Sequence, residues 1–347
     1  MLATIASVSQ SKKGGIILSK KCITFQPSCR CDGSKDCSDF SDELNCKTLY
    51  WTNKEAYSNE IPPPPSKGED AANKTKGKLF NSDLLNSSFA LVVISATILN
   101  ILELKELEGI WQPKVILQME WFDSRLSMQN LKDDIQLNVL ANEERHDPWL
   151  PIVIFINNKE SQRFVLDKKA SLVVRKEGNG TDNTAKDLDA AEVYYGSENP
   201  FLYGRTYSME LECDFNLRSY PFDTQECFIE LGVPFALKTK VELEAYKIYF
   251  NGSTDLPQFE VQSSFVVTES ENAYFIVKFK RKFAYHLVSV YIPSLSLLAV
   301  SLATMHISID HFEANIMVHL TAMLVMYTLF QAISISLPKV IVTVFSL

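Results

Sequence analysis

The chain has 347 residues, of which 46% are hydrophobic and 22% are charged, so it is long enough for more than one domain and too apolar for wholesale disorder. Its formal net charge of −8 argues against nucleic acids and anionic membrane surfaces as binding partners. The apolar residues concentrate towards the C-terminal end, which indicates structure embedded in a membrane there.

The N-terminal part carries the signs of a secreted domain. Residues 1–21 contain no clear signal peptide, because the start is too short and too polar for an apolar leader core. Five of the seven cysteines fall within the first fifty residues, which is typical of a small disulfide module in an oxidising compartment. Four Asn-x-Ser/Thr sequons predict glycosylation at Asn73, Asn86, Asn179 and Asn251.

Residues 22–46 hold a dense group of carboxylates: Asp32, Asp36, Asp42 and Glu43. Such crowding is unfavourable unless a hard cation such as calcium lies among the oxygens. The stretch resembles the second half of a low-density-lipoprotein receptor class A module, which implies bound calcium and a Cys31–Cys46 disulfide. The family's first two cysteines are absent, and the pairing stays open for Cys22, Cys29 and Cys37. A solvated acidic patch is the alternative interpretation of the four carboxylates.

Residues 47–85 have the composition of a linker. Four consecutive prolines at 62–65 predict an extended polyproline II spacer, and a lysine-rich stretch follows them.

Residues 86–282 show strand patterns. Apolar and polar residues alternate at 115–121, 207–213 and 274–280, and residues 152–156 form a short apolar run. Many short strands together with a cysteine pair predict an immunoglobulin-like antiparallel β-sandwich.

Cys213 and Cys227 bracket thirteen residues with Tyr-Pro-Phe-Asp at 220–223. Such a loop, closed by a disulfide, would present an apolar tip, Phe222, and a charge, Asp223, to another domain. The stretch resembles the signature loop of the Cys-loop, or pentameric ligand-gated, ion channels. Two further fragments fit that family in order and spacing, Trp-x-Asp-x-Arg-Leu at 121–126 and Trp-x-Pro at 149–151.

The resemblance implies a ligand pocket in the vicinity of Trp149 and Gln118. Relatives that bind amino-acid transmitters grip the ligand carboxylate with an arginine where this chain has Gln118. A simple amino-acid transmitter is therefore disfavoured, and we expect a small-molecule, proton or metal-ion ligand.

Two apolar segments follow. Residues 283–309 and 314–338 contain no Lys, Arg, Asp or Glu, and each is long enough to cross roughly 30 Å of hydrocarbon as a helix. They predict a transmembrane α-helical hairpin. Tyr-Ile-Pro-Ser at 291–294 resembles the first helix of the glycine-, GABA- and glutamate-gated branch.

The second helix is the candidate pore lining. An inward stripe at helical spacing would comprise Met317, Thr321, Leu324, Thr328 and Gln331. Leu324 falls where the family has its hydrophobic gate, which closes by dewetting. The alternative is a leucine that packs or faces lipid, with the threonines bonded back to their own helix.

A basic run precedes the first helix and ends in Arg281 and Lys282. We expect Phe222 and Asp223 to lie at the membrane end of the sandwich, where an Asp223–Arg281 contact would couple ligand-driven motion to the helices. The family has a basic residue at this place.

No pattern typical of an enzyme is present. The resemblance implies instead a multi-pass subunit of a homo- or hetero-pentameric channel in the plasma membrane, with its N-terminal domain outside. The first helix and residues 323–331, which are similar to arthropod-type pH- and metal-sensitive chloride channels, favour anions, whereas a ring of Glu313 would attract cations. The family has four membrane helices, so residues 339–347 are expected to be a truncated tail. A cation channel and a non-conducting, membrane-tethered binding or decoy form are the alternatives.

Overall fold

The computed structural model describes residues 34–35, 43, 46–50, 54–65, 89–165, 170–182, 192–269, 271–306 and 312–336. Its longer strands are β2 (Ala90–Lys105), β3 (Ile110–Trp121), β6 (Asn158–Val165), β10 (Phe201–Glu212), β11 (Thr224–Gly232), β12 (Val241–Phe250), β13 (Phe259–Glu269) and β14 (Asn272–Arg281). The shorter strands are β1 (Leu49–Tyr50), β4 (Ser127–Gln129), β5 (Ile154–Phe155), β7 (Ser171–Val174), β8 (Thr181–Asp182) and β9 (Glu192–Tyr195). The helices are α2 (Phe283–His286), α3 (Ile292–Thr304) and α4 (Phe312–Ser336).

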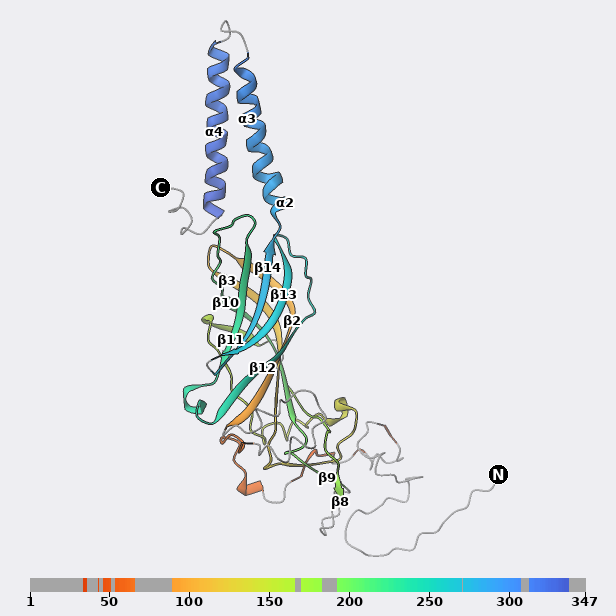
Figure 1. Cartoon of the computed structure of the whole chain (residues 1–347). Coiled ribbons are helices and arrows are strands. Elements are labelled where there is room, and N and C mark those ends of the chain that lie inside the picture. Colours follow the sequence, from red (N-terminus) through yellow and green to blue (C-terminus); the bar gives the residue numbers. More distant parts are fainter. Residues whose placement is uncertain are drawn as a thin grey trace, which may run out of the picture.

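Two sheets form a sandwich from which the helices project (Figure 1). One sheet has the order β12-β2-β3-β10-β6, with β7 also on β10, and the other has the order β13-β14-β11-β5. All pairs in these sheets are antiparallel except β12 and β2, which run parallel. A small third sheet has the order β1-β4-β9-β8, and its β8 and β9 lie at the end far from the helices. The predicted fold, a β-sandwich followed by two apolar helices, is confirmed.

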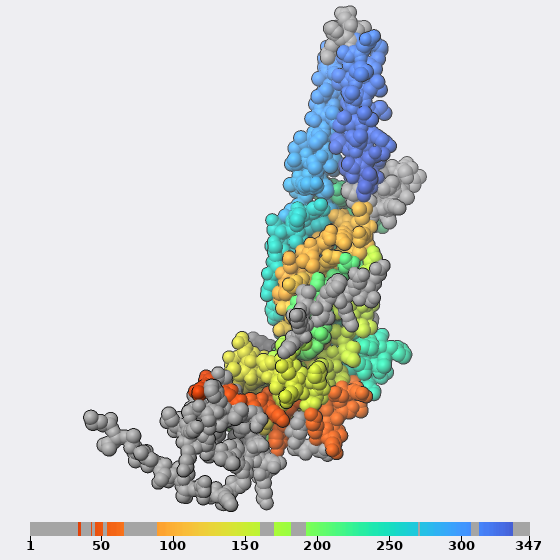
Figure 2. Space-filling model, turned by 180° about the vertical axis from the view of Figure 1, so that it is seen from behind, coloured from red at the N-terminus to blue at the C-terminus, as the bar shows by residue number. Residues whose placement is uncertain are grey.

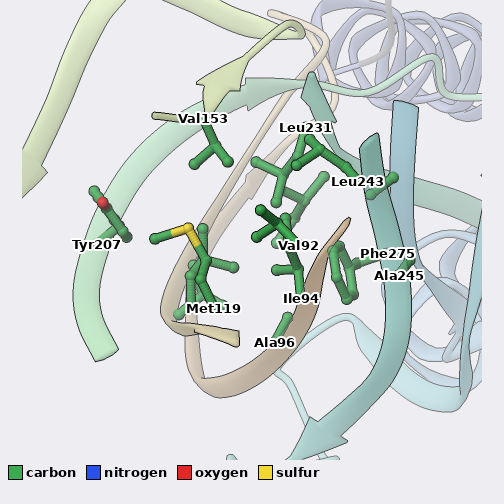
Figure 3. Close-up of a cluster of buried hydrophobic side chains, with 14 of the residues drawn as sticks. Val92, Ile94, Ala96, Met119, Val153, Tyr207, Leu231, Leu243, Ala245 and Phe275 are labelled. Carbon is green, nitrogen blue, oxygen red and sulfur yellow. The ribbon is translucent and has the colours of Figure 1, made fainter. Parts of the chain in front are cut away.

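The core lies between the two large sheets and follows the two-residue period of their strands. In β3 the side chains of Val115, Leu117 and Met119 are buried, and in β14 those of Phe275 and Val277 are buried. Figure 3 shows side chains from β2, β3 and β10 facing side chains from β11 and β14. Each fully buried aliphatic or aromatic side chain contributes about 1.5–3 kcal/mol, so this inner layer holds the sheets together.

The described part of the segment predicted to be a linker differs from that expectation. Leu49 is 3% exposed, and β1 pairs with β4. The backbone N–H groups of Thr48 and Leu49 donate to the buried carboxylate of Glu144, at 3.1 and 3.0 Å. Local composition could not show this, because every partner lies far along the chain.

The first apolar segment runs from α2 through a π-helical turn, η6 (Leu287–Tyr291), into α3. The turn lies immediately before Pro293, whose ring cannot share space with the carbonyl four residues earlier, so the backbone widens there. Phe283–Thr304 and Phe312–Ile335 are each long and apolar enough to cross a membrane. In the view of Figure 2 the helices stand clear of the strands except at their base.

Candidate functional site

The loop between β10 and β11 is closed by the disulfide Cys213–Cys227, which also ties the two sheets together. Gln225 is 1% exposed and braces the loop from inside: its Oε1 accepts from Asn216 N at 2.7 Å, and its Nε2 donates to Asn216 O at 2.9 Å. Cys213 N also donates to Gly109 O at 2.9 Å. The loop is thereby fixed to the turn between β2 and β3.

An ion cluster of Arg281, Asp223 and Glu106 lies at the helical end of the sandwich. The Nε of Arg281 donates to Asp223 Oδ1 at 2.7 Å, and its Nη2 donates to Oδ2 at 3.0 Å. Nη1 and Nη2 each reach one oxygen of Glu106 at 2.7 Å. The side chains of Arg281 and Asp223 are 1% and 2% exposed, so both pairs are shielded from water.

Hydrogen bonds and neighbouring charges keep Asp223 and Arg281 ionised. Burial raises the pKa of the Asp223 carboxyl, but hydrogen bonds from Arg281 and Gln225 outweigh burial, and the net shift is downward. Burial likewise opposes the charge of Arg281, but the hydrogen bonds and charges of Glu106 and Asp223 raise its pKa above the ordinary value. The cluster holds one cation between two carboxylates, a geometry that a shift of any one segment would break.

Aromatic side chains extend the cluster to the first helix. The guanidinium of Arg281 lies 4.9 Å from the ring centre of Tyr220 and 4.5 Å from that of Phe259. The Tyr220 hydroxyl lies 2.9 Å from Nδ1 of His286 in α2. Phe222 at the loop tip is 69% exposed, and its ring centre lies 5.5 Å from that of Phe283.

Three segments therefore meet at one point: the β2–β3 turn, the Cys213–Cys227 loop, and the junction of β14 with α2. A displacement of either sandwich segment must move Arg281 or leave buried charge uncompensated. The arrangement can transmit motion between the sandwich and the helices.

The hairpin contact defines the faces of α4. Its buried side towards α3 carries His319 and Ala322, and Ala322 is 9% exposed. Thr304 donates to Ser301 O at 2.7 Å, so its hydroxyl oxygen accepts from His319 Nε2 at 3.2 Å. Nδ1 of His319 then accepts from the Ser301 hydroxyl at 2.7 Å. His319 thus fixes the rotation of α4 against α3.

The predicted pore stripe lies about half a turn round α4 from His319, at about 100° per residue. All its members are exposed in the single chain: Met317, Thr321, Leu324, Thr328 and Gln331. Thr321 and Thr328 donate to carbonyls of their own helix, as the alternative interpretation expects, and Gln331 donates to Tyr327. Glu313, also exposed, lies in the first turn of α4, which begins two residues before the predicted boundary.

The two residues predicted near a ligand pocket lie in different surroundings. Trp149 is 2% exposed, and its ring meets Trp121 edge to face, so it is a core side chain in the single chain. Gln118 is exposed on β3 beside Gly204 of β10. On the same face, Glu120 is ion-paired with Arg175, and burial raises the pKa of its carboxyl despite that partner.

Most of the predicted calcium site lies outside the described residues, as do Cys31, Asn73 and Asn86. This holds for Asp32, Asp36 and Asp42, whereas Glu43 is described. Cys46 is disulfide-bonded. Within the described ranges no group of three or more potential metal-binding side chains occurs, and calcium stays a prediction.

The described sequons lie on the surface. Asn179 and Asn251 are both exposed, so each is accessible to a glycosylating enzyme. Their glycosylation stays a prediction.

Two residues of this structure escaped the sequence analysis. Glu106 lies in a turn that also contains Glu108, and no periodicity distinguishes the carboxylate that binds Arg281 from its neighbour. Tyr57 lies in the predicted linker, yet its hydroxyl donates to Asp123 Oδ2 at 3.0 Å and accepts from Trp149 N at 2.7 Å. The one available signal was a set of three aromatic residues, Tyr50, Trp51 and Tyr57, before the proline run.

Known proteins resemble a large part of this chain. The family described as "Neurotransmitter-gated ion-channel ligand binding domain" matches residues 85–292. A glutamate-gated chloride channel from Drosophila melanogaster is 26% identical over 271 residues, covering 72% of this chain and 53% of that protein. A gamma-aminobutyric acid receptor subunit beta from Caenorhabditis elegans is 21% identical over 273 residues, covering 75% of this chain and 45% of that protein.

The chain spans about half the length of these curated relatives. The matched region includes β2 to β14 and therefore the whole ion cluster. This chain belongs to the neurotransmitter-gated ion-channel ligand-binding domain family.

Proposed function

We propose that the chain is a subunit of an extracellular ligand-gated ion channel in the plasma membrane, assembled as a pentamer and conducting anions. The family is one of ligand-gated ion channels and not of enzymes. A relative named for chloride conduction supports the anion assignment.

The observation that carries this proposal is the buried ion cluster. Arg281 is the last residue of β14, one residue before the N-cap of α2, and it is bound by carboxylates from two loops of the sandwich. Breaking a buried pair by removing one partner typically costs about 3–5 kcal/mol. A movement of either loop within the sandwich is therefore transmitted through Arg281 to the start of the first helix.

The face of α4 that carries the stripe supports a pore role. Packing against α3 occupies the opposite side, which leaves Met317 and Leu324, 62% and 63% exposed, free to surround a central axis in an assembly. Nearly all of α4 is exposed in one chain, so exposure alone does not identify the pore-facing side. The side that packs against α3 identifies it, because the stripe lies opposite. A ring of Leu324 would form the dewetted gate, and a ring of Glu313 is the feature that would favour cations instead.

The ligand is proposed to be a small molecule, a proton or a metal ion. Gln118 gives the exposed face of β3 a neutral amide, and the nearest described carboxylate on that strand, Glu120, is occupied by Arg175.

Current recording from cells tests the proposal. The subunit is expressed and challenged with glutamate, γ-aminobutyric acid, zinc and pH steps, with chloride replaced in turn. We expect an evoked current whose reversal potential follows chloride. A reversal potential that follows sodium would replace the anion assignment with the Glu313 alternative. Surface expression without current in any condition would favour the non-conducting binding form.

A further inference from the structure

The described residues before the sandwich, 46–50 and 54–61, bind to one of its loops, residues 140–149. We call residues 46–50 and 54–61 the N-terminal clamp. Thr48 and Leu49 are bonded to Glu144, and Asn59 Nδ2 donates to His146 O at 2.9 Å. Lys54 is ion-paired with Asp147 at 2.7 Å. These contacts therefore fall on residues 144–147, the middle of the loop.

Tyr57 makes the innermost contact of the clamp. Its hydroxyl donates to Asp123 at 3.0 Å and accepts from the backbone N–H of Trp149 at 2.7 Å. Asp123 is fully buried, and burial followed by the charge of Asp123 raises the pKa of the Tyr57 phenol, so the hydroxyl keeps the proton that it donates. Arg125 lies 4.6 Å from the centre of the Tyr57 ring and donates to Ile61 O at 2.9 Å.

The segment that Trp149 begins is anchored at both ends. Its first N–H is held by Tyr57, and at its other end Asn157 donates to Phe228 O at 2.8 Å and to Glu212 O at 3.2 Å. Between these anchors the side chains of Ile152, Ile154 and Ile156 are 57%, 41% and 46% exposed. The segment thus presents an apolar row whose position depends on both anchors.

We propose that the N-terminal clamp is a positioning element for residues 149–157, and that Tyr57 is the positioning residue that sets where this segment begins. Cys46, which is disulfide-bonded, adjoins Lys47 and Thr48 at the start of the clamp. A force on Cys46 thereby has a direct route through the clamp to the segment expected to border the ligand pocket. The expected effect on the agonist response rests on the proposed function. The positioning of residues 149–157 by the clamp does not depend on it.

The test compares Tyr57→Phe with Asn59→Ala in the complete subunit. Both residues bond to the same loop, but Asn59 is exposed and its bond competes with water, so it is the matched control. Tyr57→Phe removes the acceptor of the Trp149 N–H. A net hydrogen bond of about 1 kcal/mol corresponds to about a fivefold change in an equilibrium.

We expect Tyr57→Phe to raise the rate of amide hydrogen exchange about fivefold in peptides covering residues 149–157. The half-activating concentration of glutamate, γ-aminobutyric acid, zinc or protons, whichever opens the wild type, should shift by a similar factor. The maximal current per surface receptor should change less. Asn59→Ala should leave both within about twofold. If Tyr57→Phe does not reach the surface, Arg125→Lys, which keeps a positive charge beside Asp123 but loses the hydrogen bond from Nη1 to Ile61 O, should shift both quantities in the same direction.

Two results overturn the proposal. Unchanged exchange across 149–157 would show that Tyr57 does not position the segment. Raised exchange with an unchanged half-activating concentration would show a purely structural contact. Hydrogen exchange needs no conduction, so the absence of any current would contradict the proposed function without deciding the clamp.

Discussion

Replacing Asp223 by Asn tests the energetics of the ion cluster. The amide keeps the size of the carboxyl but removes its charge, and its NH2 group then opposes N–H donors of Arg281 and Gln225. Glu106 still neutralises Arg281, so no cation is left alone. Weakened hydrogen bonds to a charged group cost about 1.5–3 kcal/mol. We therefore expect the free energy of unfolding to fall by about 2 kcal/mol, which is about 4–8 °C for a domain of this size.

The pH dependence of this loss has a definite sign. The pKa of folded Asp223 lies below that of the unfolded chain, so its stabilisation is fully present above the unfolded value of about 3.9. It is lost as the pH falls through the lower, folded pKa. The wild-type and Asp223→Asn melting temperatures should therefore differ at neutral pH and converge in strong acid.

Thermal unfolding of the purified chain in detergent, from pH 7 downwards, measures both effects. Glu226→Gln is the matched control, because Glu226 lies three residues further along the chain, in β11, in an exposed pair with Lys278, and its loss should cost less than about 1 kcal/mol. Equal melting temperatures for Asp223→Asn and Glu226→Gln at neutral pH would refute the reasoning. A difference in melting temperature between the wild type and Asp223→Asn that increases towards acid pH would refute it as well.

Three other predictions address the loop, the pore and the surface. Cys213→Ser opens the disulfide and should lower the free energy of unfolding by about 3 kcal/mol, a loss that Cys227→Ser should reproduce in thermal unfolding. Leu324→Ser should hydrate the gate and give the complete channel a standing current without agonist; an unchanged holding current would contradict the pore assignment. Asn179→Gln should remove one glycan from the surface protein, so the variant should run faster than the wild type on a gel. N-glycosidase treatment of the wild type should shift the band in the same direction by at least as much. Identical mobility of the variant and the untreated wild type would mean that Asn179 is unmodified.

The sequence predicted two members of the ion cluster, Asp223 and Arg281, but not the third, Glu106. Opposite charges at the ends of two motifs suggested Asp223 and Arg281, and the strand register explains why they meet: Thr224 pairs with Lys280, so Asp223 and Arg281 are the next pair outward. Glu106 could not be predicted, because its choice over Glu108 depends on how one turn packs against the loop.

Tyr57 shows the same limit for the N-terminal region. Its partners lie 66 and 92 residues away in the chain, so proline-rich composition alone predicted a spacer. The stripe on α4 was predicted from helical spacing, but only the contact of His319 with Ser301 and Thr304 shows which side of α4 packs against α3.

The central claim, that the ion cluster couples the sandwich to the helices, is tested most directly with Arg281→Lys in the complete subunit. Lysine keeps the charge but cannot bind two carboxylates with a planar fork. The measurement is the maximal evoked current divided by the number of surface receptors. The account predicts normal surface number and a ratio reduced by about tenfold, from the loss of charge-assisted hydrogen bonds. A ratio equal to that of the wild type would contradict it.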